Sequence, residues 1–249
     1  MKVITINIHN TVRYISIAVK AFTLLLLFAL TVNFFTGRIY EKKLYINAIN
    51  ELTDEKIIII DPGHGGEDCG AIGKNGKYEK ELNLEVAKTL GDMLCEKGYA
   101  VVYTRTEDRL LYNEDENIKG LRKIYDLKNR CKLADKYENS IFISIHMNSY
   151  SDEKYSGLQV YYSKNNELSR ELANSIQNTV REKLQHENKR AIKTGENMYL
   201  MKNLNNPAVL IECGFLSNGE DCRKLSEKEY QKQLSFTILC GIIEYIEKN

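Results

Sequence analysis

The chain has almost no net charge, no tryptophan, two prolines and only four histidines among its 249 residues. Its formal charge is +1, from 35 basic and 34 acidic residues, so no global field directs it to nucleic acid or to an acidic lipid surface. It contains neither a low-complexity tract nor an internal repeat. Hydrophobic residues at 43% and charged residues at 28% are ordinary for a globular protein, and the length suffices for one sizeable domain with its own core.

Cysteine occurs six times, but in no pattern that defines a site. The spacing matches neither a disulfide-dense scaffold nor a CxxC zinc site. An exported protein could pair some cysteines, although we interpret most of them as small apolar core residues. Two of them, Cys69 and Cys213, lie close in sequence to the candidate site described below, and their role stays open. The full set is Cys69, Cys95, Cys131, Cys213, Cys222 and Cys240.

The first forty residues differ from the rest. Residues 21–37 contain no charge, and extension back to Tyr14 adds only Lys20. A membrane-spanning helix needs roughly 20 apolar residues, so the segment is intermediate between a signal peptide and a signal anchor. Basic residues before it favour an inside amino terminus, and basic residues after it weaken that interpretation. No small-x-small cleavage site follows the apolar run. The alternative of a buried core helix is disfavoured because the segment lacks a polar face.

This pattern predicts three parts. Residues 1–37 form an amino-terminal membrane anchor or signal segment, residues 38–55 form a polar linker, and residues 56–249 form the folded domain. We expect that domain to lie outside the cytoplasm, either membrane-anchored or secreted.

Strands alternate with helices along the folded domain, which predicts an α/β domain with a mainly parallel sheet covered by helices on both faces. We expect strands at residues 56–61, 100–105, 140–146, 157–163, 197–202 and 208–212. We expect helices at residues 79–97, 126–137, 165–186 and 231–247. A glycine-rich loop spans residues 65–77, and a long polar stretch spans residues 106–125.

Two of the four histidines and one glutamate stand at the ends of predicted strands. The first strand runs into His64, the third ends at His146, and the last ends at Glu212. Open α/β sheets place their sites outside the carboxyl ends of the strands, so these side chains should converge. A single loop histidine is more often solvated or hydrogen-bonded locally, but the shared position of two histidines favours a metal site. The pattern is typical of a zinc hydrolase.

A catalytic zinc site uses three protein ligands and keeps one open position, so a third ligand is needed. Glu79 precedes Leu82 by three residues and shares the buried face of the first helix, whereas Glu81 lies about 200° around that helix from Glu79. We therefore expect His64, Glu79 and His146 to bind one Zn²⁺ ion. A favourable position of Glu79 at the helix amino terminus is an alternative that can hold at the same time.

Glu212 follows three apolar residues of its strand. An apolar surround raises the pKa of a carboxylate towards the range of a general base, so we expect Glu212 to be catalytic. Cys213 points to the opposite face of the strand. The alternative for Glu212 is a buried ion pair with an arginine. Asn148, just beyond His146, is a candidate substrate-binding residue.

Six segments in order resemble the zinc-dependent N-acetylmuramoyl-L-alanine amidases of the amidase-3 family. They cover essentially all of residues 56–247, and together they are highly specific. The matching segments are IIIIDPGHGGEDCGAIG (57–73), EKELNLEVA (79–87), VVYTR (101–105), FISIHMNS (142–149), GLQVYY (157–162) and PAVLIECGFLSN (207–218). The resemblance implies a single catalytic domain with a mainly parallel, six-stranded sheet. It also implies zinc ligands His64, Glu79 and His146, with Glu212 as the catalytic glutamate.

The resemblance implies cleavage of the amide between the lactyl group of N-acetylmuramic acid and L-alanine of the peptidoglycan stem peptide. An apolar amino-terminal segment on a lone catalytic domain further resembles the spore-cortex amidases of the CwlD type, which strip stem peptides so that muramic-δ-lactam can form. The expected partners are stem peptides, glycan, the membrane through the amino-terminal segment, and an accessory protein. No nucleic acid is expected.

Two other functions are weighed against this one. A non-catalytic relative that binds peptidoglycan is disfavoured because the chain keeps all four site residues. A zinc exopeptidase of related fold is disfavoured by the match around EKELNLEVA. The stretch of residues 106–125 is interpreted either as an accessory loop for a partner or substrate strand, or as a solvated insertion.

Overall fold

The computed structural model describes residues 25, 28, 31–33, 56–112 and 120–249. The chain divides into two compact units, Met1–Asp54 and Glu55–Asn249. The predicted apolar segment and linker therefore lie almost entirely outside the described residues. Among the residues that are described, no helix is both long and apolar enough to cross a membrane.

The second unit is built on a six-stranded sheet in the order β2-β1-β3-β6-β4-β5. All neighbouring strands pair in parallel except β4 and β6, which are antiparallel. The predicted α/β domain with a mainly parallel six-stranded sheet is confirmed. The strands are β1 (Ile57–Pro62), β2 (Val101–Tyr103), β3 (Ser140–Asn148), β4 (Gln159–Tyr162), β5 (Lys193–Thr194) and β6 (Ala208–Phe215).

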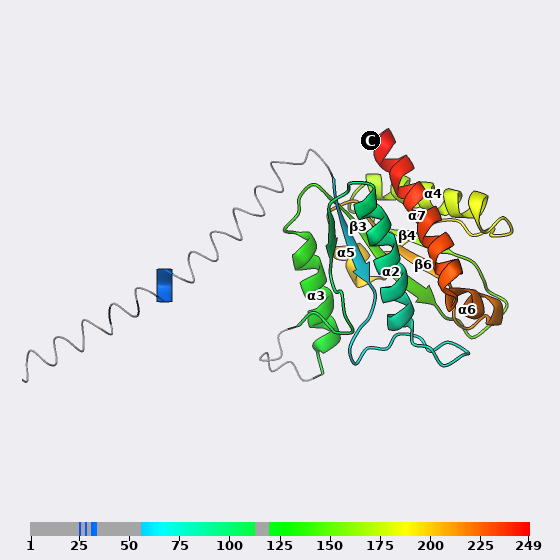
Figure 1. Cartoon of the computed structure of the whole chain (residues 1–249), viewed down its shortest axis with the longest axis horizontal. Coiled ribbons are helices and arrows are strands. Elements are labelled where there is room, and N and C mark those ends of the chain that lie inside the picture. The colour runs from blue at the N-terminus through cyan, green and yellow to red at the C-terminus, as the bar shows by residue number, and fades with distance from the viewer. Residues whose placement is uncertain (1–24, 26–27, 29–30, 34–55, 113–119) are drawn as a thin grey trace, which may run out of the picture. The chain divides into compact units, whose positions relative to one another are not determined.

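Helices cover both faces of this sheet (Figure 1). The apolar core lies between one face and the helices α2, α4 and α7, and the opposite face carries α3 and α5. The helices are α2 (Glu79–Glu96), α3 (Arg122–Ala134), α4 (Leu168–Lys183), α5 (Tyr199–Asn203), α6 (Gly219–Leu225) and α7 (Lys228–Lys248).

The central strands are buried on both faces, which explains their continuous apolar runs. Ile58, Ile59 and Ile60 have no exposed surface, although successive residues point to opposite faces. A strand covered on both sides selects apolar residues at every position rather than at every second one. The polar residues His64, His146 and Glu212 lie near the carboxyl ends of β1, β3 and β6, beyond these apolar runs.

The strand predicted at residues 197–202 is wrong. Those residues form the helix α5, and the sixth strand is instead Lys193–Thr194, which pairs with Tyr161 and Tyr162 of β4. The adjacent residues Leu200 and Met201 are both buried, which one helical turn achieves and an edge strand does not. Periodicity alone cannot separate a strand from a helical turn in so short an apolar run.

Several boundaries of the predicted helices and strands also differ in the structure. Helix α3 begins at Arg122, within the predicted polar stretch, and ends at Ala134. Strands β3 and β6 continue past His146 and Glu212, to Asn148 and Phe215. The short helix α6 was not predicted, and the Asn218 side chain caps it by accepting hydrogen bonds from two backbone N–H groups. Of the long polar stretch, residues 113–119 lie outside the described part.

The six cysteines are free thiols. Cys131, Cys213 and Cys222 are buried, as expected of small core residues, whereas Cys95 is exposed and the other two are partly buried. Burial raises the pKa of the Cys213 thiol, which packs in the apolar core. Cys213 is therefore a core residue on the face opposite to Glu212.

Candidate active site

The turn after β1 directs His64 over the edge of the sheet. His64 has a φ of 61°, the one positive value among the non-glycine residues described, and Gly65 and Gly66 follow with positive φ. Glycine adopts this conformation at no steric cost, which allows the tight turn. Gly63 admits no side chain, because a Cβ there would lie 2.2 Å from the ring of His146. Glycines on both sides of His64 therefore allow the turn to bring the two predicted histidines together.

Glu79 lies between these histidines. Its Oε1 is 3.1 Å from Nε2 of His64 and 3.0 Å from Nδ1 of His146. One ligand atom from each of the three residues lies within 4.8 Å of the others. Glu81 is exposed and does not join them. The geometry thus unites the three residues that the sequence singled out, and Glu79 rather than Glu81 is the glutamate among them.

Glu79 is held as a carboxylate by several donors. Its Oε1 accepts a hydrogen bond from the backbone N–H of Met147, and its Oε2 accepts one from the backbone N–H of Ala71. Burial by itself would raise the pKa of Glu79, but hydrogen bonds and charge from His146 and His64 hold it well below its usual range. The carboxylate is therefore negative at any physiological pH, as a metal ligand must be.

Asp68 orients His64 from the other side. Its Oδ2 lies 2.9 Å from Nδ1 of His64, so Nε2 of that ring faces Glu79. Burial lowers the pKa of His64, but the hydrogen bonds to Asp68 and Glu79 outweigh it and raise the pKa to about 9. The sequence analysis missed Asp68. Its only signal was an acid four residues after a histidine in a loop, where no periodicity assigns a direction.

Glu212 lies beside this cluster on β6. It pairs in register with His146 of β3 on one side and with Gln159 of β4 on the other. Its Oε2 is buried and has no hydrogen-bond partner among the described residues. Burial, with a smaller contribution from Glu79, raises the pKa of Glu212 to about 7.

The alternative in which an arginine neutralises Glu212 is not found, since no arginine in the described part of the chain pairs with it. On the neighbouring strand, Arg190 donates a hydrogen bond to Gln159, the residue paired with Glu212, and not to Glu212 itself. Glu212 therefore offers a free carboxylate oxygen at the edge of the histidine cluster, as a group that accepts a proton requires.

The spacing of the cluster fits a metal ion. Ligands at 2.0–2.1 Å from one tetrahedral zinc ion stand about 3.3 Å from each other. The two contacts of Glu79 Oε1, at 3.0 and 3.1 Å, are close to this value. Two imidazoles and one carboxylate also match an open catalytic site rather than a closed structural one. The three residues can therefore hold one ion and leave a position for substrate.

Two buried arginines donate hydrogen bonds to the backbone carbonyls of the turn after β1. Arg130 donates to Oδ1 of Asp61 at 2.6 Å and to the carbonyl of His64 at 2.8 Å. Arg105 donates to the carbonyls of Pro62 and Gly63, each at 2.9 Å. Each arginine is 1% exposed, so these contacts are shielded from water. The sequence analysis did not assign either residue to the site.

The comparisons with known proteins agree with this geometry. The sequence profile of the Amidase_3 family, described as N-acetylmuramoyl-L-alanine amidase, matches residues 58–244. That span includes the histidine cluster, Glu212 and all six strands except the first residue of β1. The chain belongs to the Amidase_3 family. It is thus an N-acetylmuramoyl-L-alanine amidase, a hydrolase of peptidoglycan.

The amidase resembles curated and solved members of this family. It is 40% identical over 191 residues to the germination-specific N-acetylmuramoyl-L-alanine amidase of Bacillus subtilis (strain 168), which covers 76% of this chain and 79% of that relative. The structure of the CwlD amidase from Clostridioides difficile in complex with the GerS lipoprotein matches with a TM-score of 0.75 and 37% identity, covering 78% of this chain and all of that one. An N-acetylmuramoyl-L-alanine amidase from Clostridium difficile 630 matches with a TM-score of 0.69 and 31% identity, over 79% of this chain and all of that one.

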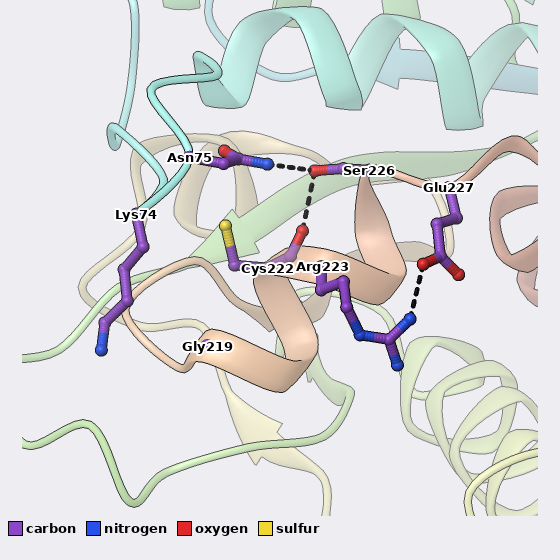
Figure 2. A pocket seen from close by; sticks show the side chains of 7 residues that line it. All are labelled: Lys74, Asn75, Gly219, Cys222, Arg223, Ser226 and Glu227. Atoms are coloured by element: carbon purple, nitrogen blue, oxygen red, sulfur yellow. Dashed lines mark hydrogen bonds and ion pairs between the residues drawn. The ribbon is translucent and has the colours of Figure 1, made fainter.

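A separate pocket of the amidase, of about 380 Å³, does not include any of these site residues. Figure 2 shows its lining, in which the Asn75 side chain reaches Ser226 across the pocket. Arg223 pairs with Glu227 at 2.5 Å, and Lys74 pairs with Glu153, so its charged groups already have partners. The pocket lies between the loop before α2 and the helix α6, and the Asn75–Ser226 hydrogen bond links these two segments. We therefore assign it a structural role.

Proposed function

We propose that the amidase uses one zinc ion, held by His64, Glu79 and His146. The donor set and its spacing support this assignment, and Asp68 supports it by fixing which nitrogen of His64 faces the ion. When bound, zinc supplies Lewis-acid polarisation of the scissile carbonyl and acidifies water.

Glu212 is the general base in this proposal. Its unpartnered Oε2 accepts the proton of the attacking water and then delivers it to the amine of L-alanine as the amide breaks. In the metal-free chain, burial raises the pKa of Glu212 to about 7, towards the neutral range in which a general base takes up and gives up a proton. The single observation that carries the proposal is this free, buried carboxylate oxygen next to three convergent metal-binding atoms.

The experiment is digestion of purified peptidoglycan with and without added zinc, followed by identification of the new amino terminus. The expected product is free L-alanine amino termini that require zinc and are absent with the Glu212→Gln chain. Release of any other terminus, or equal release after chelation and without zinc, contradicts the proposal.

We further propose that the amidase acts on the spore cortex, where it removes stem peptides before muramic-δ-lactam forms. The likeness to a germination-specific amidase and to a CwlD amidase supports this role. Cortex from spores that lack the chain should contain no muramic-δ-lactam. Spores with normal lactam content would exclude the role while leaving the amidase activity intact.

An accessory protein is part of the proposal, because the CwlD relative was solved with a lipoprotein. The stretch of residues 106–125 is the proposed contact, since Asp108 ties its first half to the histidine turn through the N–H of Gly66 at 2.7 Å. Shortening the stretch while Arg105, Asp108 and Arg130 stay in place should preserve zinc binding and reduce activity on intact peptidoglycan in cell extract. Unchanged activity would remove the loop from the proposal.

We also propose that residues 1–37 carry the domain across or into the membrane, that residues 38–55 are a linker, and that residues 56–249 act outside the cytoplasm. The charge-free run of residues 21–37 supports this. A reporter that works only outside the cytoplasm, fused after Glu55, should be active. A signal from a cytoplasm-only reporter at that junction would contradict it.

Asn148 is the proposed substrate-binding residue. It stands two residues beyond His146 and pairs in register with Phe215. Its carboxamide is suited to the peptide groups of the stem. Asn148→Ala should raise KM and leave zinc content unchanged, and an unchanged KM would exclude the role.

A further inference from the structure

Glu212 stands within a row of polar side chains that crosses three strands. It pairs in register with His146 of β3 and with Gln159 of β4. Residues directly opposite each other on paired strands point to the same face of the sheet. The row therefore continues past Glu212, on the side away from His146, into Gln159, which is 2% exposed.

Arg190 ends this row. Its Nη1 donates to Oε1 of Gln159 at 3.0 Å, and its Nε donates to the carbonyl of Ser156 at 2.8 Å. Its guanidinium carbon lies 4.4 Å from the ring centroid of Phe215 and 5.6 Å from that of Tyr155. Two hydrogen bonds and two aromatic rings thus fix the guanidinium in place before any substrate arrives.

The fixed guanidinium has no acidic partner. Within the described parts of the chain, Arg190 has no carboxylate at ion-pair distance, and its side chain donates only through Nε to Ser156 and through Nη1 to Gln159, which leaves Nη2 without a hydrogen bond. Arg130, by contrast, pairs with two carboxylates. A preorganised, partly buried guanidinium with a free edge is suited to bind a carboxylate, because its fork geometry matches the two oxygens.

The spacing places this free edge within reach of the peptide part of the substrate. Neighbouring strands are about 4.8 Å apart, so Gln159 stands about one strand spacing from Glu212. Arg190 lies one side chain farther, roughly 10 Å from Glu212. Two to three extended residues span about the same length. The sugar side of the scissile amide is neutral, whereas the stem peptide carries carboxylates.

We propose that Arg190 binds the carboxylate of the second stem-peptide residue, on the side of Glu212 opposite to the histidine cluster, with Tyr155 as the apolar wall beside it. This assignment rests on the proposed cleavage before L-alanine. It makes Arg190 a specificity-determining residue that anchors the leaving peptide while Glu212 acts on the amide.

The test compares two synthetic muropeptides that differ only in that carboxylate, which is free in one and a primary amide in the other. Binding is measured by calorimetry to the zinc-loaded Glu212→Gln chain, so that cleavage does not interfere. The free carboxylate should bind about tenfold more tightly, the lower range for a hydrogen bond to a charged group. A second substitution in the Glu212→Gln chain then tests Arg190. Arg190→Gln should abolish the difference in affinity between the two muropeptides, and Arg190→Lys should retain part of it.

The matched control is Lys189→Gln, which removes one unit of charge from the exposed neighbouring residue and should keep the tenfold difference. If the zinc-loaded Glu212→Gln chain, in which Arg190 is unchanged, binds the two muropeptides equally, the proposal is wrong. A preference that survives Arg190→Gln, or that disappears with Lys189→Gln, overturns it as well.

Turnover by the unmodified chain separates this inference from the proposed function. If that chain leaves both muropeptides uncut while the binding preference depends on Arg190, the carboxylate subsite stands and the proposed cleavage fails. If both muropeptides are cut at L-alanine with equal kcat/KM and bound equally, the cleavage stands and the subsite fails.

Discussion

Arg130 holds the backbone of His64 in a left-handed conformation. Its Nη2 donates a 2.8 Å hydrogen bond to the carbonyl of His64, whose φ is 61°. Such a conformation costs about 1–3 kcal/mol for a residue other than glycine, and it persists only where the surroundings determine it. Arg130 is itself fixed by Asp61 at 2.6 Å and by Asp126 at 2.8 Å. A buried ion-pair network therefore sets the direction of a candidate metal ligand.

Arg130→Gln should weaken both the fold and the metal site. It leaves two buried carboxylates without their cation, and loss of one partner of a buried pair costs about 3–5 kcal/mol. Urea unfolding measures the stability and chelator competition measures zinc affinity. Arg122→Gln is the control, because Arg122 forms a solvent-exposed ion pair with Glu67, and such pairs contribute little to stability. Unchanged zinc affinity in the folded Arg130→Gln chain would show that the network does not position His64.

Glu212→Gln should keep the zinc and lose turnover. The amide cannot accept a proton, so the loss should exceed the roughly 10²–10⁴-fold usual for one acid–base group, since water activation also fails. Elemental analysis gives the zinc content and amino-terminus release gives the rate. Cys213→Ser should retain activity, because Cys213 packs in the core on the opposite face. Near-normal turnover by Glu212→Gln would exclude the base assignment.

The value of kcat/KM should rise with pH on its acid side. Burial raises the pKa of Glu212 to about 7 in the metal-free chain, and a bound cation beside the carboxylate lowers that pKa. The base must be deprotonated to act, so activity increases as pH rises through a pKa at or below about 7. A pH profile of the zinc-loaded enzyme measures this. An acid limb above pH 8, or activity that falls over this range, would be inconsistent with Glu212 as the base.

Asp68→Asn should weaken zinc binding by about 10–100-fold, the usual effect of removing the carboxylate that orients a ligating histidine. Asp68 lies 2.9 Å from Nδ1 of His64, and the uncharged amide holds the ring less firmly. Chelator competition at one fixed pH measures the change. Glu67→Gln, at an exposed neighbouring carboxylate, should have no effect. Equal affinities for the two variants would assign Asp68 no role at the site.

Glu79→Gln should lose zinc and Glu81→Gln should not. Glu79 Oε1 contacts both histidines, whereas the side chain of Glu81 is exposed on the same helix. The two substitutions remove the same charge two residues apart, so they form a matched pair. Zinc stoichiometry after gel filtration separates them. Zinc loss from the Glu81→Gln chain alone would reverse the assignment.

The sequence by itself determined the sheet and the strand ends that carry the site. The apolar runs before His64, His146 and Glu212 are readable because strands buried on both faces select apolar residues at every position. Helical periodicity likewise separated Glu79 from Glu81, since only one of them shares the face of Leu82. Strand hydrophobicity and helical periodicity depend only on residues near one another in the chain, so they can be recognised in the sequence.

Only the tertiary structure decided how the site is supported. Arg130 is 66 residues from His64 in the chain, and Asp68 lies in a glycine-rich loop without a repeating period. The row from Glu212 to Arg190 depends on the register of β4 against β6, which pairs residues 53 positions apart. The short helix α5 also replaced a predicted strand, because burial against the sheet outweighed a weak local pattern. Contacts between distant residues arise from packing, and no local pattern records them.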